Sequence, residues 1–206
     1  TGSPANTLEL ATADLEAMAR VGIRTVLLFE TSGEIPEGPV KFLSDEWRAL
    51  FRHALDEAAR LGLKLNINND AGWCGSGGPW NTPENSMQKL VSTRTSVEGG
   101  KPFDAVLPQP PAVKGFYRDI VVLATPALPA GEDKKRIWPP SQAVDLTART
   151  DASGRLRWDP PAGTWDILRI GHTSTGKDNH PSPASGTGPE CDKLSKTAVK
   201  AHFDGK

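Results

Sequence analysis

The chain contains little cysteine and no excess of charge of either sign. Its 206 residues include 2 cysteines, and 24 Lys and Arg stand against 25 Asp and Glu, for a formal net charge of −1. Cys74 and Cys191 lie far apart in sequence, which is weak evidence for a disulfide framework and does not match the close ligand pairs of a zinc site. The balanced charge excludes the broadly basic surface that non-specific nucleic-acid binding requires.

Long apolar runs are also missing. No stretch approaches the ~20 residues of a membrane-spanning helix, so we expect no membrane span. No signal peptide is visible, and the chain opens on Thr1, so we expect a processed, trimmed or partial product. Hydrophobic residues make up 37% of the chain, enough for a folded core.

Helix and strand patterns alternate over the first ninety residues. Apolar runs at residues 25–29 and 64–68 predict two strands, and the three-and-four repeat over 44–61 predicts the helix between them. An earlier helix is expected to end at Gly22, and a Pro in the first turn predicts another helix over 82–91. This order predicts βαβ units in a parallel sheet or (β/α) barrel, where ligands gather at the carboxyl ends of the strands.

The pattern becomes strand-like further along the chain and predicts a small antiparallel β module. We expect strands over 90–97, 119–124 and 164–170, and a hairpin joining 143–150 to 155–158 through a turn at 151–154. A polar loop and a helix over 192–203 follow. The predicted organisation is therefore βα units over 1–91, a β-rich insertion over 92–172, and a returning loop and helix over 173–206.

Polar side chains stand where the two predicted strands end. Asn68, Asn69 and Asp70 follow the second strand, and Glu30 follows the first. Amides and a carboxylate at a strand end can hydrogen-bond sugar hydroxyls or bind a hard cation through oxygen. Alternatively, they terminate the strand with an Asx-turn. Both interpretations stay open.

A glycine-rich loop with two tryptophans follows at residues 71–80. Its glycines let the backbone approach a ligand closely, and the rings of Trp73 and Trp80 are suited to stacking under a sugar. In the alternative, both rings cover the adjacent core. The loop matches neither a P-loop nor a dinucleotide fingerprint. Ser76 lacks the strand-to-helix elbow of a serine nucleophile.

Three further residues are candidates for a site. His172 ends a predicted strand beside a polar loop, which favours a ligand contact. Asp192 stands before the last helix, either as a binding residue or as its N-cap, and Glu190 lies two residues earlier. The residues together favour a polar small molecule or a glycan as ligand, without indicating the reaction.

Several strings resemble family 106 of the glycoside hydrolases, the α-L-rhamnosidases, and they occur in the order expected for that family. The resemblance covers nearly the whole chain. It is carried by residues 14–23, 77–80, 82–91, 117–124, 161–165, 171–177 and 190–195, and by His202 and Phe203.

The resemblance implies a (β/α)-barrel catalytic domain with a β insertion, in an exported, periplasmic or extracellular bacterial enzyme. Such an enzyme removes terminal α-L-rhamnosyl residues from plant or bacterial polysaccharides with inversion, using glutamates and a calcium ion near the sugar. The substrate-binding candidates are Asn68, Asp70, Trp73, Trp80, His172 and Asp192. The catalytic glutamates are expected after Lys206, with Glu190 as the one local candidate.

A complete barrel needs about 250 residues. The chain is therefore expected to form an α/β fold, a partial (β/α) TIM-type barrel with an inserted antiparallel β module, and to need the remainder of the parent enzyme. We expect it to be inactive alone. A non-catalytic carbohydrate-binding or scaffold segment, or another glycosidase specificity on the same fold, are the alternatives.

Overall fold

The structure is a computed structural model that describes residues 4–32, 38–127 and 140–205. It divides into two compact units. The first, here called the α/β unit, comprises Thr1–Met87 and Gly176–Lys206, and the second, the β module, comprises Gln88–Thr175. Within the described residues, no helix is both long and apolar enough to cross a membrane.

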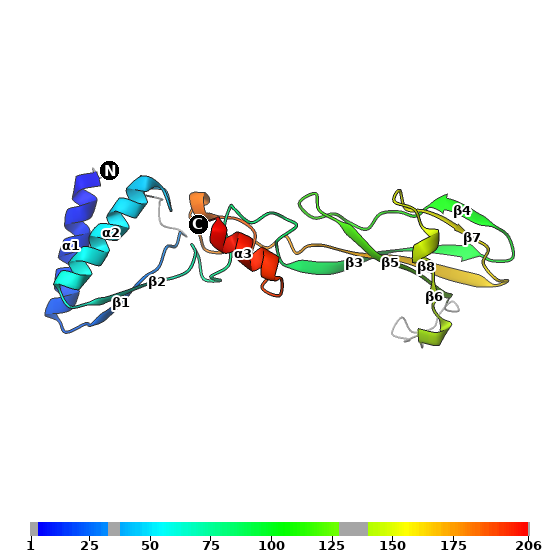
Figure 1. Ribbon diagram of the computed structural model, residues 1–206, viewed down its shortest axis with the longest axis horizontal. Coiled ribbons are helices and arrows are strands. Elements are labelled where there is room, and N and C mark those ends of the chain that lie inside the picture. Colours follow the sequence, from blue (N-terminus) through cyan, green and yellow to red (C-terminus); the bar gives the residue numbers. More distant parts are fainter. Residues whose placement is uncertain (1–3, 33–37, 128–139, 206) are drawn as a thin grey trace. The chain divides into compact units, whose positions relative to one another are not determined.

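The α/β unit begins with two helices that alternate with two strands (Figure 1). These elements are α1 (Pro4–Arg20), β1 (Thr25–Leu28), α2 (Asp45–Arg60) and β2 (Lys64–Ile67). The strands pair in parallel, with Thr25 opposite Lys64. Helix α2 begins where predicted, because the Ser44 side chain accepts a hydrogen bond from the backbone N–H of Trp47. The βαβ order predicted for this region is confirmed.

The two helices cover one face of the strand pair. Leu15 of α1 and Ala58 of α2 are buried together with Leu63, and Val26 and Leu65 from the strands pack against them. Successive strand residues point to opposite faces. Leu27 therefore points away from the helices, and 57% of it is exposed.

In the rest of the α/β unit, the long loop after β2 pairs with the C-terminal segment through backbone hydrogen bonds. Isolated antiparallel bridges join Gly77 to Glu190 and Ser86 to Cys191, and the Met87 N–H donates to the carbonyl of Glu190. A short 3-10 helix, η3 (Ala184–Gly186), and helix α3 (Lys196–Asp204) complete the unit.

The helix predicted over 82–91 is wrong. Residues 83–85 form a turn, and from Gln88 the chain enters strand β3 (Gln88–Glu98). Pro83 lies in this turn, and its carbonyl accepts from the Ser86 hydroxyl. The alternating β-branched residues that follow find a full-length antiparallel partner, which outweighs the local helix signal.

The β module contains a four-stranded antiparallel sheet in the order β3-β8-β5-β6 and a separate pair, β4-β7. Its core lies among Leu107, Val122, Ala124, Leu146, Leu156, Trp158 and Ile167. The elements after β3 are β4 (Phe103–Val106), β5 (Arg118–Pro126), η1 (Pro140–Gln142), β6 (Val144–Asp145), η2 (Thr147–Arg149), β7 (Arg155–Trp158) and β8 (Thr164–Ser174).

The predicted hairpin in this module is only partly correct. The turn over 151–154 forms, because the Asp151 carboxylate accepts from the N–H groups of Ser153 and Arg155. Strand β7, however, pairs with β4 and keeps only one bridge, Thr150 to Leu156, toward the preceding segment. Local turn chemistry therefore determined the bend but not the partner strand.

The fold is mixed α and β, but it does not show the predicted barrel. Among the described residues β1 and β2 form the one parallel pair, the other sheets are antiparallel, and every sheet is open at its edges. Of the predicted partial TIM-type barrel with a β module, the structure shows one parallel βαβ unit and the antiparallel module. It shows no barrel, because two parallel strands cannot close one.

Candidate active-site region

The carboxyl ends of β1 and β2 lie together in the α/β unit. The Gly72 N–H donates to the carbonyl of Glu30 at 2.8 Å, which joins the segment after β2 to the segment after β1. The indole Nε1–H of Trp47 donates to Glu30 Oε2 at 3.0 Å. The first turn of α2 is thereby fastened to the end of β1.

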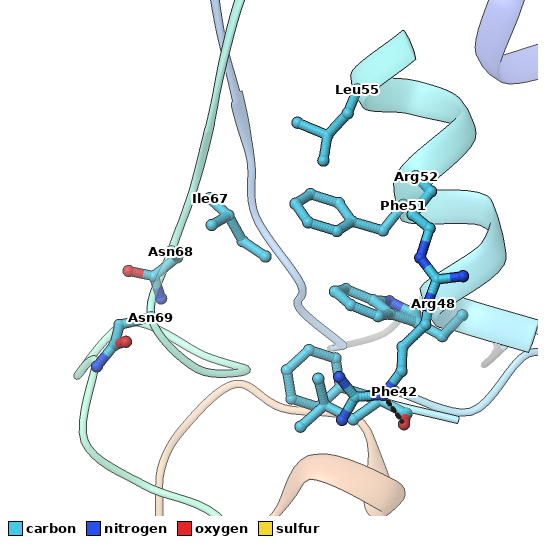
Figure 2. Close-up of a pocket in the computed structure, with 10 residues that line it drawn as sticks. Phe42, Arg48, Phe51, Arg52, Leu55, Ile67, Asn68 and Asn69 are labelled. Carbon is cyan, nitrogen blue, oxygen red and sulfur yellow. Dashed lines mark hydrogen bonds between the residues drawn. The ribbon is translucent and has the colours of Figure 1, made fainter. Parts of the chain in front are cut away.

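A cavity of about 380 Å³ opens beside these strand ends (Figure 2). Figure 2 shows Phe51 and Leu55 pointing from α2 toward Ile67 on β2, with Asn68 and Asn69 on the strand side. The lining residues are Phe42, Leu43, Trp47, Arg48, Phe51, Arg52, Leu55, Ile67, Asn68 and Asn69.

Three aromatic rings form one wall of this cavity. The ring of Trp47 packs edge-on against the ring of Phe42, with centroids 5.1 Å apart. It stacks on the ring of Phe51, with centroids 5.3 Å apart. Rings at these separations attract each other beyond simple burial, which stabilises the packing of the wall. Such a wall suits the apolar face of a sugar ring.

Two arginines one helical turn apart add positive charge. The Nε–H of Arg48 donates to the carbonyl of Leu43 at 3.2 Å, which directs this side chain toward Phe42 (Figure 2). Within the described part of the chain, neither Arg48 nor Arg52 has a carboxylate within ion-pair distance. The cavity therefore combines an aromatic wall, guanidinium groups and amides.

A second, mostly apolar cavity of about 270 Å³ shares Trp47 and Phe51 with the first. Among the described residues, Glu30 is the one acidic side chain that lines it, and its carboxylate accepts from the indole N–H of Trp47. It is lined by Ala11, Leu28, Glu30, Val40, Trp47, Leu50, Phe51 and Ala54.

Asp70 organises the loop that follows β2. It is 1% exposed, and its carboxylate oxygens accept from the N–H of Gly75 at 2.9 Å and the N–H of Gly77 at 2.6 Å. The Cys74 thiol lies 3.4 Å from the same carboxylate, and the Asn68 amide donates to the carbonyl of Gly72 at 2.6 Å. The carboxylate of Asp70 is thus turned into the loop, so its effect on a ligand would be indirect.

The two tryptophans of the glycine-rich loop lie in different environments. Trp73 is 72% exposed, so its ring is available to a ligand. Trp80 packs against α3: its Nε1–H donates to His202 Nδ1 at 2.9 Å, and its ring lies against Gly78 and Gly205. A Cβ at Gly78 would approach this ring to 2.2 Å, which explains the glycine there.

Glu190 lies near the same loop and is ion-paired. Lys193 Nζ donates to Glu190 Oε2 at 2.9 Å, and the Ser76 hydroxyl lies 3.4 Å from that oxygen. The hydrogen bond that Lys193 donates to Glu190 raises the pKa of Lys193. Burial raises the pKa of the Cys74 thiol, so this thiol stays protonated at neutral pH.

Asp192 does not cap α3. Its Oδ1 accepts from the N–H of Leu194, whereas the N-cap is Ser195, whose hydroxyl accepts from the N–H of Ala198.

His172 belongs to the β module, on β8, where its Nδ1 lies 3.2 Å from Gln88 Oε1 and its ring packs against Phe116. The candidates at residues 68–80 and 190–192 share the α/β unit, and His172 does not.

The described residues do not fit the calcium ion that the resemblance implies. They contain no group of three or more His, Cys, Asp or Glu side chains that could hold a metal. The buried carboxylate of Asp70 faces N–H donors, and that of Glu190 faces an ammonium group. A hard cation needs several oxygen ligands instead.

Sequence reasoning missed the cavity-lining residues on α2 and before it. The three-and-four repeat over 44–61, which includes Trp47 and Phe51, was used only to predict a helix, and Phe42 was not considered. A signal was present: Trp47-Arg48 and Phe51-Arg52 repeat an aromatic–arginine pair at a spacing of four, which places like residues on the same side of a helix.

Comparisons with known proteins agree on the class of enzyme. A family model described as alpha-L-rhamnosidase, glycoside hydrolase family 106, matches residues 6–128 and 121–205. A protein of Formosa agariphila named "Putative beta-glucuronidase" is 42% identical over 219 residues, which span 94% of this chain and 19% of that protein.

A solved structure of a rhamnosidase from Novosphingobium sp. PP1Y has a similar fold. Its TM-score is 0.77 at 20% sequence identity, with 96% of this chain and 34% of that chain covered. The chain thus spans about a fifth of the curated relative and about a third of the solved one. On the family match, the chain belongs to glycoside hydrolase family 106, the α-L-rhamnosidase family.

Proposed function

We propose that the chain supplies part of the catalytic region of an exported glycoside hydrolase that removes terminal α-L-rhamnosyl residues with inversion. The observation that carries this proposal is the cavity at the strand ends. There, Asn68 and Asn69 line the same cavity as the packed aromatic rings of Phe42, Trp47 and Phe51. Rings bind the apolar face of a sugar, and amides bind its hydroxyls.

We further propose that the parallel pair β1-β2, with α2 crossing between the strands, is the start of a (β/α) barrel completed by the rest of a longer enzyme. Two findings support this. The relatives are much longer than the chain, and the apolar Leu27, which points away from the helices, is 57% exposed. Further strands would cover such residues.

Inverting hydrolysis needs one carboxylic acid to protonate the leaving oxygen and one carboxylate to activate water, roughly 6.5–9.5 Å apart. Asp70 is committed to backbone N–H groups, and Glu190 is paired with Lys193. We therefore propose that the catalytic pair comes from the remainder of the enzyme, and that Asn68, Asn69 and Trp73 bind the glycan.

A second specificity is favoured by one relative. The protein from Formosa agariphila is 42% identical, and its name describes a β-glucuronidase. A fold can carry several glycosidase specificities, because the site residues decide the substrate. Hydrolysis of a β-glucuronide is therefore the competing proposal.

Chromogenic substrates separate these proposals. An aryl α-L-rhamnoside and an aryl β-D-glucuronide are offered to the 206-residue chain and to a longer enzyme that contains it. We expect rhamnoside turnover by the longer enzyme and none by the chain alone. Turnover of only the glucuronide would replace the proposed specificity, and silence of a folded longer enzyme toward both would favour a non-catalytic binding role.

A variant of the longer enzyme tests the cavity itself. Asn69→Ala is expected to raise KM by roughly 2–10-fold, the value of one hydrogen bond, with kcat little changed. Gln142→Ala, which removes an exposed amide in the β module, serves as the matched control. An unchanged KM in Asn69→Ala would contradict a role for this cavity in substrate binding.

A further inference from the structure

The cavity beside α2 has a charge that binding a neutral sugar does not require. Arg48 and Arg52 both line it, and within the described residues no carboxylate lies in ion-pair distance of either. Elsewhere in the chain, Arg60, Arg155 and Arg169 each have such a partner at 2.6–2.7 Å. Among the described residues, the positive charge of the two cavity arginines therefore has no carboxylate counter-charge.

The surroundings of these arginines are suited to an anion. Phe42, Trp47 and Phe51 exclude water from one side of the cavity and so strengthen electrostatic attraction. A guanidinium group matches a carboxylate with two parallel hydrogen bonds. One end of Arg48 is already fixed by the carbonyl of Leu43, which lowers the entropy lost when a ligand binds.

The remaining lining groups favour a sugar over a simple inorganic anion. Asn68 and Asn69 line the cavity on the side opposite α2. Their side chains turn away from the aromatic rings (Figure 2), and their amide groups donate to the carbonyls of Gly72 at 2.6 Å and Gly75 at 2.9 Å. A volume of about 380 Å³ lies at the lower end of the range for small-molecule sites, which suits one monosaccharide unit.

We infer that this cavity is a subsite for a carboxylate-bearing sugar, a uronic acid unit of an acidic glycan. Arg48 and Arg52 bind the carboxylate, and the aromatic wall supports the ring. The inference rests on the proposed function and narrows its substrate class to acidic glycans. The carboxylate is bound and not transformed, so no bond changes at this subsite.

Two ligands that differ only in the carboxylate provide the test. Methyl β-D-glucuronide and methyl β-D-glucoside are titrated into the 206-residue chain, shown to be folded by circular dichroism, and binding is followed by ligand-observed NMR. We expect the glucuronide to bind about tenfold or more tighter than the glucoside, with the preference shrinking as salt is raised. Arg48→Gln and Arg52→Gln should each reduce the preference several-fold.

The control variant is Arg149→Gln, which removes the same charge from an exposed position in the β module and should leave binding unchanged. Equal binding of both sugars, no binding of either, or an equal loss in Arg149→Gln would overturn the inference. So would loss of glucuronide binding in the longer enzyme, because the cavity would then be filled by protein. These binding readouts are independent of rhamnoside turnover, so the inference and the proposed function fail separately.

Discussion

The β module and the α/β unit are each stabilised internally in a different way. Among the described residues, one cluster of the β module buries seven apolar residues, whereas the corresponding cluster of the α/β unit buries three. In the α/β unit, Leu27 and Ile67 remain about half exposed, and the cavity lies open between α2 and β2. The β module is thus closed around its own core, and the α/β unit leaves apolar surface for a ligand or for more protein to cover.

Buried charge is also used differently in the two units. In the β module, Arg169 is 5% exposed and binds the carboxylate of Asp119 through two hydrogen bonds of 2.7 and 2.8 Å. It also donates to the carbonyl of Leu107 and thereby ties neighbouring segments to the sheet. In the α/β unit, Asp70 holds one local loop. The hydrogen bonds of Arg169 thus connect segments that are far apart in the sequence of the β module, whereas those of Asp70 fix only the loop beside the proposed site.

The largest expected effect compares the two cores directly. Leu156→Ala in the β module, where Leu156 is 0% exposed, should lower the free energy of unfolding by about 2–5 kcal/mol, because it leaves a cavity. Leu27→Ala in the α/β unit should cost less than about 0.5 kcal/mol, because the side chain is largely in water. Chemical denaturation, with hydrogen exchange resolving each unit, measures both. Similar losses of unfolding free energy in the two variants would contradict the view that only the β module is closed around its own core.

An intermediate effect is expected at Asp70. In Asp70→Ala the buried N–H group of Gly77 and the partly buried N–H group of Gly75 lose their acceptor, at a cost of about 2 kcal/mol. Hydrogen exchange should accelerate at these two amides and stay unchanged in the β module. Asp56→Ala, at an exposed position on α2, is the control. If protection were lost throughout the chain, Asp70 would be supporting more than its own loop.

The smallest effect is a pH dependence confined to the β module. The hydrogen bond from Arg169 lowers the pKa of Asp119 in the folded state. The folded protein therefore prefers the ionised carboxylate, and the resulting stability is present at neutral pH and lost as pH falls through the folded pKa, below about pH 4. The gain is small, because the Asp119 side chain is 47% exposed and screened by water.

Denaturation of the wild type and of Asp119→Asn at pH 7 and pH 3 measures this dependence. The wild type should be the more stable at pH 7, and the difference should shrink at pH 3. A difference that is equally large at both values would assign the effect of the substitution to packing and not to charge. Burial, followed by the hydrogen bond to Asp119, also raises the pKa of Tyr117 to about 12, so Tyr117 stays neutral throughout.

Local signals in the sequence predicted much of the fold. Ser44 identified the start of α2, and the apolar runs identified β1 and β2. Asp151 and Gly154 identified the turn before β7, where Gly154 adopts a positive φ of 82°. Each of these features depends on residues within a few positions of one another, which is why composition and spacing were sufficient.

Features that depend on distant partners were not predicted. The helix expected over 82–91 gave way to a strand paired with β8, some eighty residues away, and β7 found β4 rather than its neighbour. The same holds for the site. Trp80 was expected either to stack under a sugar or to cover the core, and its hydrogen bond to His202 could not be read from the sequence. The cavity gathers Phe42, Trp47 and Asn68 from three segments.

The sequence by itself determined the family, the order of the βα elements and the polar residues at the strand ends, because these are properties of short, contiguous strings. The tertiary structure alone decided which of those residues face a cavity. Asp70 turned inward because two backbone N–H groups needed an acceptor, and Arg48 and Arg52 reached the cavity because α2 packs beside β2. Burial and hydrogen bonding between distant segments cannot be read from the spacing of residues along the chain.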